Sequence, residues 1–137
     1  MLATICACAK LRRSARIVTA LYDEALEPSG LSVAQFSLLR LLKRAGPSSL
    51  TQFAEAAGYD RTTLNRTLKP LEAAGLVASS PSVDRRARIV TVTDKAEAVM
   101  RRGQPHWEAA QEKIEDILGQ DHAALFSILD RIDELRA

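Results

Sequence analysis

Residues 61–69 carry the side chains of this sequence that are best suited to one specific kind of chemistry. The segment has three cations and no carboxylate, whereas an ordinary solvated helix surface mixes charges of both signs. Asn65 and Arg66 carry the amide and guanidinium groups that bind base edges in a DNA major groove, and Lys69 can bind a phosphate. The segment therefore favours contact with double-stranded DNA over a plain solvated surface. The residues with this predicted role are Arg61, Thr62, Thr63, Asn65, Arg66 and Lys69.

Two short predicted helices separated by a glycine place this segment in a helix-turn-helix. Residues 50–57 form a first helix with one apolar face, and a Ser-x-x-Gln capping box opens it. Gly58 supplies the turn, where a positive φ is needed, and Asp60 caps a second helix that runs to about residue 74. Pro70 lacks a backbone N–H, so we expect this helix to kink or to end early just before it. The inward side of the second helix consists of Leu64, Leu68 and Leu71.

A β-hairpin is predicted directly after the helix-turn-helix. Residues 76–80 and 88–92 are short and partly β-branched, and the polar residues 81–87 join them. The tip of this loop reads Asp84-Arg85-Arg86. A two-stranded wing can place an arginine in the narrow minor groove of DNA, and Asp84 can hold one arginine through a charge-assisted pair. A solvated turn would have a similar composition, but the position after a helix-turn-helix favours DNA contact.

The composition agrees with a helical fold that carries a small wing. The chain of 137 residues is 47% hydrophobic and 26% charged, which is typical of a globular protein. Because it has few aromatic residues, Leu, Ala, Ile and Val must fill most of the core, and Leu and Ala favour helices. The predicted fold class is mainly α with a small β-hairpin, a winged helix-turn-helix with further helices at both ends.

Three long helices with apolar faces are predicted outside the winged unit. They span about residues 4–27, 94–118 and 121–135, and Pro105 predicts a kink in the second. Each is too apolar to stand alone in water, so packing against the same helices of a second copy would bury these faces. Such a homodimer would present two recognition helices about one DNA turn (~34 Å) apart. The predicted division is a DNA-binding lobe of residues 32–92 and dimerisation helices of residues 1–31 and 93–137.

The charge of the chain is unevenly distributed along the sequence. Residues 1–103 hold 16 Lys and Arg against 9 Asp and Glu, whereas residues 104–137 hold 3 against 8. The basic part can face a polyanion and the acidic part cannot. No apolar run approaches the ~18–20 residues of a membrane span. The first cations also follow the apolar N-terminus, whereas a secretory signal has them before it. We therefore expect a cytoplasmic protein without membrane contact.

The sequence lacks the motifs of the common enzyme classes. It has no Gly-rich phosphate loop and no His–Glu metal motif, and nothing near Cys6 or Cys8 resembles the catalytic frame of a thiol peroxidase. A metal site is also disfavoured, because Cys-x-Cys gives two ligands while His106 and His122 are distant in sequence. We expect no enzyme activity, no metal and no cofactor. The alternative is a winged-helix module that binds protein, although such modules often lack a cationic outer face.

The whole chain resembles the MarR family of bacterial regulators. This resemblance implies a single domain over residues 1–137 that forms a dimer and binds a palindromic operator. It also implies a repressor that is released by a small ligand or by oxidation. The resemblance rests on the order and spacing of a long first helix, Ser32–Phe36 at the start of the second, Leu50–Gly58, Arg61–Gly75, Leu76-Val77, Asp84-Arg85-Arg86 and Val92-Thr93.

The resemblance also bears on one cysteine. Cys8 lies 27 residues before Gln35, which matches the place of the reactive cysteine in the organic-hydroperoxide sensors of the family. Tyr22 matches a tyrosine that bonds this cysteine in those sensors. Arg12 and Val33 stand where those sensors have two further tyrosines, so the chain departs from their pattern. The resemblance therefore implies that Cys8 and Tyr22, together with the neighbouring Cys6, are candidates for redox sensing.

The chemistry of the two cysteines leaves two interpretations open. A thiolate is the reactive form, and nearby cations such as Lys10 favour it. On one helix Cys6 and Cys8 would stand about 200° apart, so they could bond to each other only if the helix unwound. Oxidation would instead give a sulfenic acid or a disulfide to the other subunit. The alternative is that both are small side chains packed along the dimer helix.

A small ligand is the competing signal. In the family that the chain resembles, ligands often lodge where the dimer helices meet the winged unit. For His106 and Trp107, packing in the core or the interface is the simpler interpretation. The residues that can line such a pocket are Arg16, Tyr22, Phe36, His106 and Trp107.

Overall fold

The computed structural model describes residues 2–83 and 87–136. Most of these residues are helical, and a small antiparallel sheet completes the fold, so the predicted mainly α class with a β-hairpin wing is confirmed. The elements in chain order are α1 (Ala7–Leu26), η1 (Glu27–Ser29), α2 (Val33–Ala45), β1 (Ser48–Ser49), α3 (Leu50–Ala57), α4 (Arg61–Ala73), β2 (Val77–Pro81), β3 (Arg88–Val92), α5 (Asp94–Leu118), η2 (Gly119–Asp121), α6 (His122–Asp133) and η3 (Glu134–Arg136).

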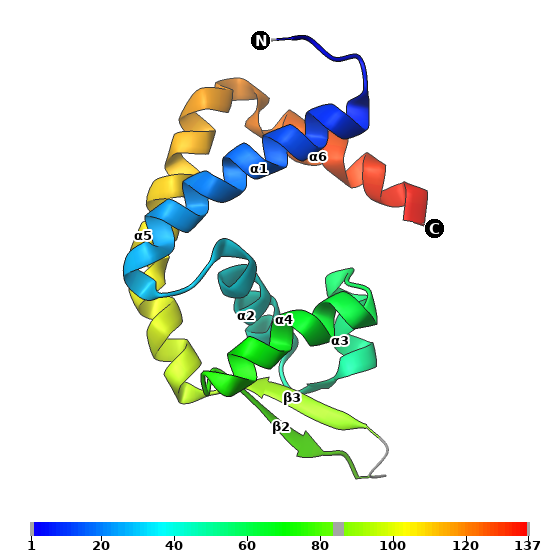
Figure 1. The fold of residues 1–137 in the computed structure, drawn as a ribbon, viewed down its shortest axis with the longest axis vertical. Coiled ribbons are helices and arrows are strands. Elements are labelled where there is room, and N and C mark those ends of the chain that lie inside the picture. Colours follow the sequence, from blue (N-terminus) through cyan, green and yellow to red (C-terminus); the bar gives the residue numbers. More distant parts are fainter. Residues whose placement is uncertain (1, 84–86, 137) are drawn as a thin grey trace.

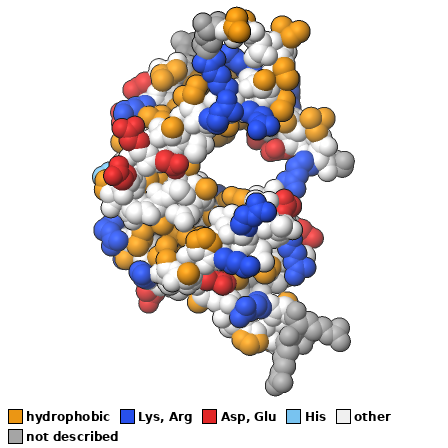
Figure 2. Space-filling model, viewed as in Figure 1, with side chains coloured by type: hydrophobic (Ala, Val, Ile, Leu, Met, Phe, Trp, Pro, Cys, Tyr) orange, Lys and Arg blue, Asp and Glu red, His pale blue; other side chains and the backbone are white. Residues whose placement is uncertain are grey.

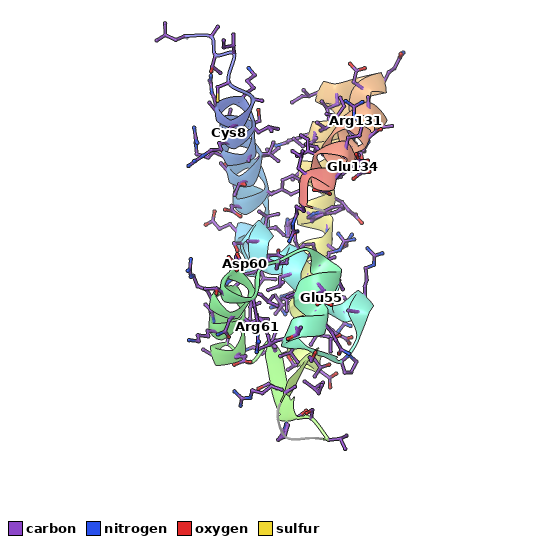
Figure 3. All side chains as sticks on the ribbon, turned by 90° about the vertical axis from the view of Figure 1, so that its right-hand side faces the viewer. Cys8, Glu55, Asp60, Arg61, Arg131 and Glu134 are labelled. Carbon is purple, nitrogen blue, oxygen red and sulfur yellow. The ribbon has the colours of Figure 1, made fainter. Side chains whose placement is uncertain are left out.

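The helices form two groups that α5 connects (Figure 1). α2, α3, α4 and the hairpin form the winged lobe, defined here as residues 31–93. α1, the later half of α5 and α6 form the helical arm, and α1 packs against α5. Figure 1 shows α5 as a long arc that contains Pro105, where the sequence predicts a kink. Figure 3 shows α1 and α6 on opposite sides of the arm.

Local capping interactions explain where the helices of the winged lobe begin. Ser32 and Gln35 form a reciprocal capping box at α2, with hydrogen bonds of 3.2 and 3.0 Å. Ser49 and Gln52 form the same arrangement at α3. Each box satisfies two backbone N–H groups that a helix start leaves without partners. Thr93 caps α5 through the backbone N–H of residue 96. The capping box predicted for α3 is therefore confirmed.

The first helix begins later than the sequence predicts. The prediction placed its start near residue 4, but α1 begins at Ala7 and Cys6 is its N-cap. Cys6 donates its backbone N–H to the Thr4 hydroxyl at 3.1 Å, and its sulfur accepts the backbone N–H of Ala9 at 3.5 Å. These local bonds hold Cys6 in an extended conformation, so the helix begins at the next residue.

The small sheet contains the predicted hairpin and one strand that was not predicted. β2 and β3 pair antiparallel from Val77 opposite Val92 to Pro81 opposite Arg88. β1 pairs with the other edge of β3, giving the strand order β1-β3-β2. A strand of two residues carries no alternating pattern, so periodicity could not reveal β1. Because β1 directly precedes α3, this pairing attaches the start of α3 to the hairpin.

The sequence predicts that α4 kinks or ends early before Pro70, and the early end is wrong. α4 continues through Pro70 to Ala73. A proline inside a helix removes one backbone hydrogen bond, but its carbonyl can still accept, and here it accepts the N–H of Ala74 at 3.0 Å. Leu68 and Leu71 flank the proline and are both buried, so packing holds this turn in place.

The core lies between the winged lobe and α5 and extends to the end of α1. Leu26, Phe36 and Phe53 are among its fully buried side chains. Gly103 lets α5 approach this core closely. A Cβ at residue 103 would lie 3.1 Å from Phe36 Cε2 and 3.4 Å from Leu26 Cδ2, which is tighter than ordinary contact. The arm and the winged lobe therefore share one packed core at this point.

Candidate nucleic-acid interface

The structure places the polar residues of α4 on its open side. All six residues with the predicted role are exposed, whereas the three inward leucines are at most 2% exposed. Figure 2 shows Lys and Arg side chains over α4 on the face seen there. The orientation expected from helical periodicity therefore agrees with the structure. The exposed set is Arg61, Thr62, Thr63, Asn65, Arg66 and Lys69.

The turn between α3 and α4 has the predicted geometry. Gly58 has a φ of 74°, a left-handed conformation that favours glycine. The backbone N–H of Tyr59 donates to the carbonyl of Ala54 at 2.9 Å, which closes the end of α3. Ala54 is buried, and its small side chain suits the close crossing of the two helices. The direction of α4 is therefore fixed relative to α3.

Asp60 caps α4 with both carboxylate oxygens. Oδ1 accepts the backbone N–H of Thr63 at 2.6 Å, and Oδ2 accepts the Thr63 hydroxyl at 2.7 Å. The backbone hydrogen bond from Thr63, followed by the one from its hydroxyl, holds the pKa of Asp60 below its ordinary value. Asp60 thus stabilises the first turn of α4 and fixes the side chain of Thr63, while Arg61, Asn65 and Arg66 remain exposed (Figure 3 labels Asp60 and Arg61).

Two hollows lie beside Asn65. One, of about 310 Å³, lies between α4 and the hairpin and includes Lys69 and Arg88 in its lining. The other, of about 260 Å³, is lined by Asn65 together with Leu50, Arg61 and Thr62. Arg88 therefore adds a cation to the surface around α4, which the sequence analysis did not include among the DNA-binding residues. Its place at the start of the second strand of the hairpin was the available signal.

The predicted tip residues Asp84, Arg85 and Arg86 lie outside the described residues. The described part of the hairpin places the two ends of this loop together, because the backbone N–H of Ser82 donates to the carbonyl of Ala87 at 2.8 Å. β2 and β3 extend beyond α4 at the end of the molecule opposite the arm (Figure 1). A contact of the tip with a minor groove stays a prediction.

The two cysteines do not share a helix. Cys6 is the N-cap of α1 and Cys8 lies in its first turn, so the expected 200° separation on one helix is wrong. Both thiols are free and exposed. Figure 3 shows Cys8 near the outer end of the arm, far from the labelled residues of α3 and α4. Chemistry at Cys8 is therefore remote from the surface of α4.

Tyr22 contacts α5 and not a cysteine. Its hydroxyl donates to the side-chain carbonyl of Gln111. Burial, and then the negative charge of Glu115, raise the pKa of Tyr22. Cys8 and Tyr22 lie on the same helix, and fourteen residues correspond to about 21 Å along its axis. A contact between these two side chains would therefore require two copies of the chain.

Of the residues predicted to line a ligand pocket, Tyr22 and Phe36 both lie beside Trp107 in the single chain, and the Tyr22 and Trp107 ring centroids are 6.3 Å apart. Arg16 is exposed on α1, whereas Phe36 is fully buried and stacks on the half-buried Trp107 with ring centroids 6.4 Å apart. Arg40, which sequence reasoning missed, lies over the Trp107 ring with its guanidinium carbon 4.5 Å from the centroid. His106 is half-buried. In this chain Phe36 and Trp107 are thus packing residues.

The described residues contain neither a metal-binding cluster nor a membrane-spanning helix. Within them, no three His, Cys, Asp or Glu side chains come together in a way that could hold a metal ion. Among the described helices, none combines the length and the apolar character needed to cross a membrane.

α3, α4 and the hairpin together define a winged helix-turn-helix protein. Residues 31–87 match the family model of the MarR family. The chain belongs to the MarR family of transcriptional regulators, so its class is a regulator and not an enzyme.

Individual relatives support this assignment. The chain is 33% identical over 88 residues to YwoH, an uncharacterised HTH-type transcriptional regulator of Bacillus subtilis (strain 168), and the match covers 64% of each protein. The chain thus spans less than two thirds of that relative. It is 30% identical to the M. tuberculosis transcriptional regulator MosR in complex with DNA, covering 96% of this chain and 99% of that one, with a TM-score of 0.83. The transcriptional repressor CouR, bound to a 23-mer DNA duplex, is 29% identical over 93% and 92% of the two chains, also with a TM-score of 0.83.

We predict that Asp60→Ala lowers the melting temperature at neutral pH, because α4 loses its cap. The ordinary pKa of this carboxyl is 3.8, and its folded-state pKa is lower. Its stabilising effect is therefore complete above the unfolded pKa and is lost as the pH falls through the folded pKa. Thermal unfolding followed by circular dichroism should show the difference from wild type shrinking below about pH 4.

Asp60→Asn is the matched control for this cap. Its amide oxygen can still accept the N–H of Thr63, so at neutral pH it should melt closer to the wild type than Asp60→Ala does. A difference between wild type and Asp60→Ala that stays constant down to the lowest pH would contradict a cap that depends on the carboxylate.

Proposed function

We propose that this chain is a homodimeric repressor that binds a palindromic operator in double-stranded DNA through α4 and the wing. The observation that carries this proposal is the open side of α4 over residues 61–69, which holds three cations and no carboxylate while buried leucines fix its orientation; Glu72 follows only in the last turn of the helix. The solved complexes of MosR and CouR with DNA support the same partner for this chain. A regulator of bacterial genes would act in the cytoplasm, where the DNA lies.

The chemistry of α4 divides its side chains between two tasks. Thr62, Asn65 and Arg66 have the hydroxyl, amide and guanidinium groups that can read base edges in a major groove. Lys69 and Arg88 lie beside them and suit phosphate contacts, which position the protein without reading sequence. The remaining proposed contacts are Arg61, Thr63 and, on the wing, Asp84, Arg85 and Arg86.

An uncovered apolar surface on the arm supports the homodimer. Large apolar side chains of α1 and α6 are exposed in the single chain, including Ile17 at 59% and Phe126 at 50%. Figure 2 shows hydrophobic side chains on the surface of the arm. A second copy of the same arm would remove these side chains from water and create a two-fold axis, as a palindromic operator requires. Residues 1–31 and 93–137 are thus proposed as the dimerisation part, and residues 32–92 as the DNA-binding part.

We propose oxidation of Cys8 as the signal that releases the DNA. The exposed Cys8 thiol can attack a hydroperoxide, forming a sulfenic acid while the other peroxide oxygen leaves as an alcohol. A cysteine thiol of the other subunit can then form a disulfide with the sulfenic acid and release water. Because Cys8 lies on the arm, such a change would alter the packing of the two arms and so reach α4 indirectly.

A small phenolic or aromatic ligand is the alternative signal, with the cysteines structural. Arg16 and Arg40 carry cations on the sides of α1 and α2, and Trp107 offers an aromatic surface that is half-buried in the single chain. A pocket of this kind would form where two arms meet the winged lobes. Release by a ligand in the absence of oxidant would favour this alternative.

We predict that Arg66→Ala weakens DNA binding by about 1–3 kcal/mol and relaxes the sequence preference, because a base contact is lost. Fluorescence anisotropy with the DNA upstream of the protein's own gene, at several salt concentrations, measures both effects. The wild-type affinity should fall steeply with salt, since phosphate contacts release counterions.

Lys113→Ala is the matched control, because it removes one exposed cation from α5 without touching the winged lobe. It should bind DNA as the wild type does. Full affinity of Arg66→Ala would remove α4 from the interface, and weak, salt-independent binding by the wild type would favour a module that binds protein.

We predict that Leu129→Glu combined with Ile132→Glu converts the dimer to a monomer, because two charges would enter the apolar surface of α6. Sedimentation velocity measures the mass directly. Ser127→Glu adds a charge to the exposed opposite side of the same helix and should leave the dimer intact. A wild type that sediments as a monomer would contradict the proposed homodimer.

We predict that Cys8→Ser binds DNA normally but is no longer released by cumene hydroperoxide, because serine cannot form a sulfenic acid. The measurement is DNA binding with and without the oxidant, followed by the reductant dithiothreitol. Cys6→Ser, altered two residues away, should still be released. If Cys8→Ser is released as the wild type is, Cys8 is not the sensor.

A further inference from the structure

The last turn of the chain returns to the winged lobe and contacts the turn of the helix-turn-helix. Arg136, in η3, donates a hydrogen bond from Nη1 to the backbone carbonyl of Gly58 at 2.6 Å. The approach is close, since a Cβ on Gly58 would lie 3.0 Å from the same nitrogen. The two residues are 78 positions apart in sequence. The contact therefore joins the C-terminal end of the arm to the element that presents α4.

This contact closes a ring of chain. α5 connects the winged lobe to the arm on one side, and α6 with η3 runs back toward α3 on the other (Figure 1). Figure 2 shows an opening through the molecule between the arm and the winged lobe. The winged lobe is therefore held on the side of α1 and α5 by the shared core around Gly103 and by the Asp23 carboxylate, which accepts the Val33 N–H at 2.7 Å, and at a separate point by the bond between Arg136 and Gly58. Two attachment points restrain rotation of a rigid body more than one does.

The electrostatics of the turn suit an arginine at this place. The Gly58 carbonyl lies at the C-terminal end of α3, where the helix dipole is negative. Glu55 and Asp60 lie on either side of Gly58 in sequence, and Figure 3 labels both on the winged lobe. A cation that reaches this turn from the arm is thus bound by a carbonyl at the negative end of a helix dipole.

The turn passes this restraint directly to α4. Tyr59 is bonded to the end of α3, and Asp60 is the cap of α4, so few free torsions separate Gly58 from the recognition helix. A displacement of Gly58 would therefore displace the start of α4. In a dimer bound to two half-sites, the position of α4 on each arm sets the distance between the two recognition helices.

We propose that Arg136 is a positioning residue for DNA binding, because its bond to the Gly58 carbonyl fixes the winged lobe on the arm and so the spacing of the two recognition helices. The proposal rests on the proposed function for its consequence at DNA, while the restraint itself is a property of one chain. The bond is exposed, so it contributes little to the free energy of unfolding. Its loss should change orientation and leave the melting temperature almost unchanged.

The first experiment measures the restraint without DNA. Spin labels on cysteines introduced at the exposed Thr51 and Ala109, with Cys6 and Cys8 changed to serine, report the distance between the winged lobe and α5. Dilution with unlabelled protein limits the signal to one chain. Double electron–electron resonance should give a narrow distribution for the wild type and a broader one for Arg136→Gln. Equal widths for the two proteins would overturn the proposal.

Arg131→Gln is the matched control. Arg131 is an exposed arginine of α6, the helix just before η3, and Figure 3 shows it on the part of α6 that points away from the winged lobe. This variant loses the same charge, so it should keep the narrow distribution. Broadening in both variants to the same degree would show a general effect of charge and would also overturn the proposal.

The second experiment measures the consequence at DNA. The probe is the palindromic duplex that the wild type selects from a random library, together with versions that have one central base pair inserted or removed. Each change moves one half-site by about 3.4 Å and rotates it by about 36°. The wild type should lose about tenfold in affinity or more, whereas Arg136→Gln should lose less than about threefold. Arg131→Gln should match the wild type.

Two further outcomes separate the possible explanations. If Arg136 contacted a phosphate, Arg136→Gln would lower the slope of log affinity against log salt by about 0.9, and a direct contact would replace the positioning role. If the wild type selects no duplex while the distance distributions behave as expected, the proposed function fails and the restraint between arm and winged lobe stands. A spacing profile of Arg136→Gln as sharp as that of the wild type would overturn the positioning role.

Discussion

The winged lobe depends on the burial of one side of α4. Leu64, Leu68 and Leu71 are almost fully removed from water, and burial of each such side chain contributes about 1.5–3 kcal/mol. Because the helix repeat places these three residues on one side, their burial also decides which residues face outward. The free energy of folding thus orients Asn65 and Arg66 without any contact of their own. An exposed polar surface of defined shape is a by-product of core packing.

The arm has the opposite character, because its helices bury only part of their apolar surface within one chain. α1 and α6 leave large apolar side chains in water, and such a surface is stable in solution mainly when another molecule covers it. In the proposed homodimer, the stability of the arm and the association of two chains are linked, so the melting temperature should depend on protein concentration. The winged lobe supplies most side chains of the buried core that it shares with α1 and α5, so it is less dependent on a second copy.

Much of the fold could be predicted because its signals are local. Capping boxes at Ser32 and Ser49 and the leucine repeat of α4 require knowledge of only a few neighbouring residues. The continuation of α4 through Pro70 was missed, since it depends on tertiary packing that overrides a local preference. The bond between Arg136 and Gly58 depends on the path of the whole arm, so no local pattern could indicate it. The outward side of α4 followed from helical periodicity. The position of Arg88 beside Lys69 depends on the register of the strands, so periodicity could not reveal it.

The close approach at Gly103 has a mechanical consequence. Where α5 lies directly on Phe36 and Leu26, the side chains interlock without space to slide, and packing of this density resists gradual deformation. A force applied to the outer end of the arm would then be carried through α5 as a rigid helix. The winged lobe would move as a whole, by a smaller distance than the arm, with its internal geometry preserved. Such motion would thus change the position of α4 and leave the structure of the helix unchanged.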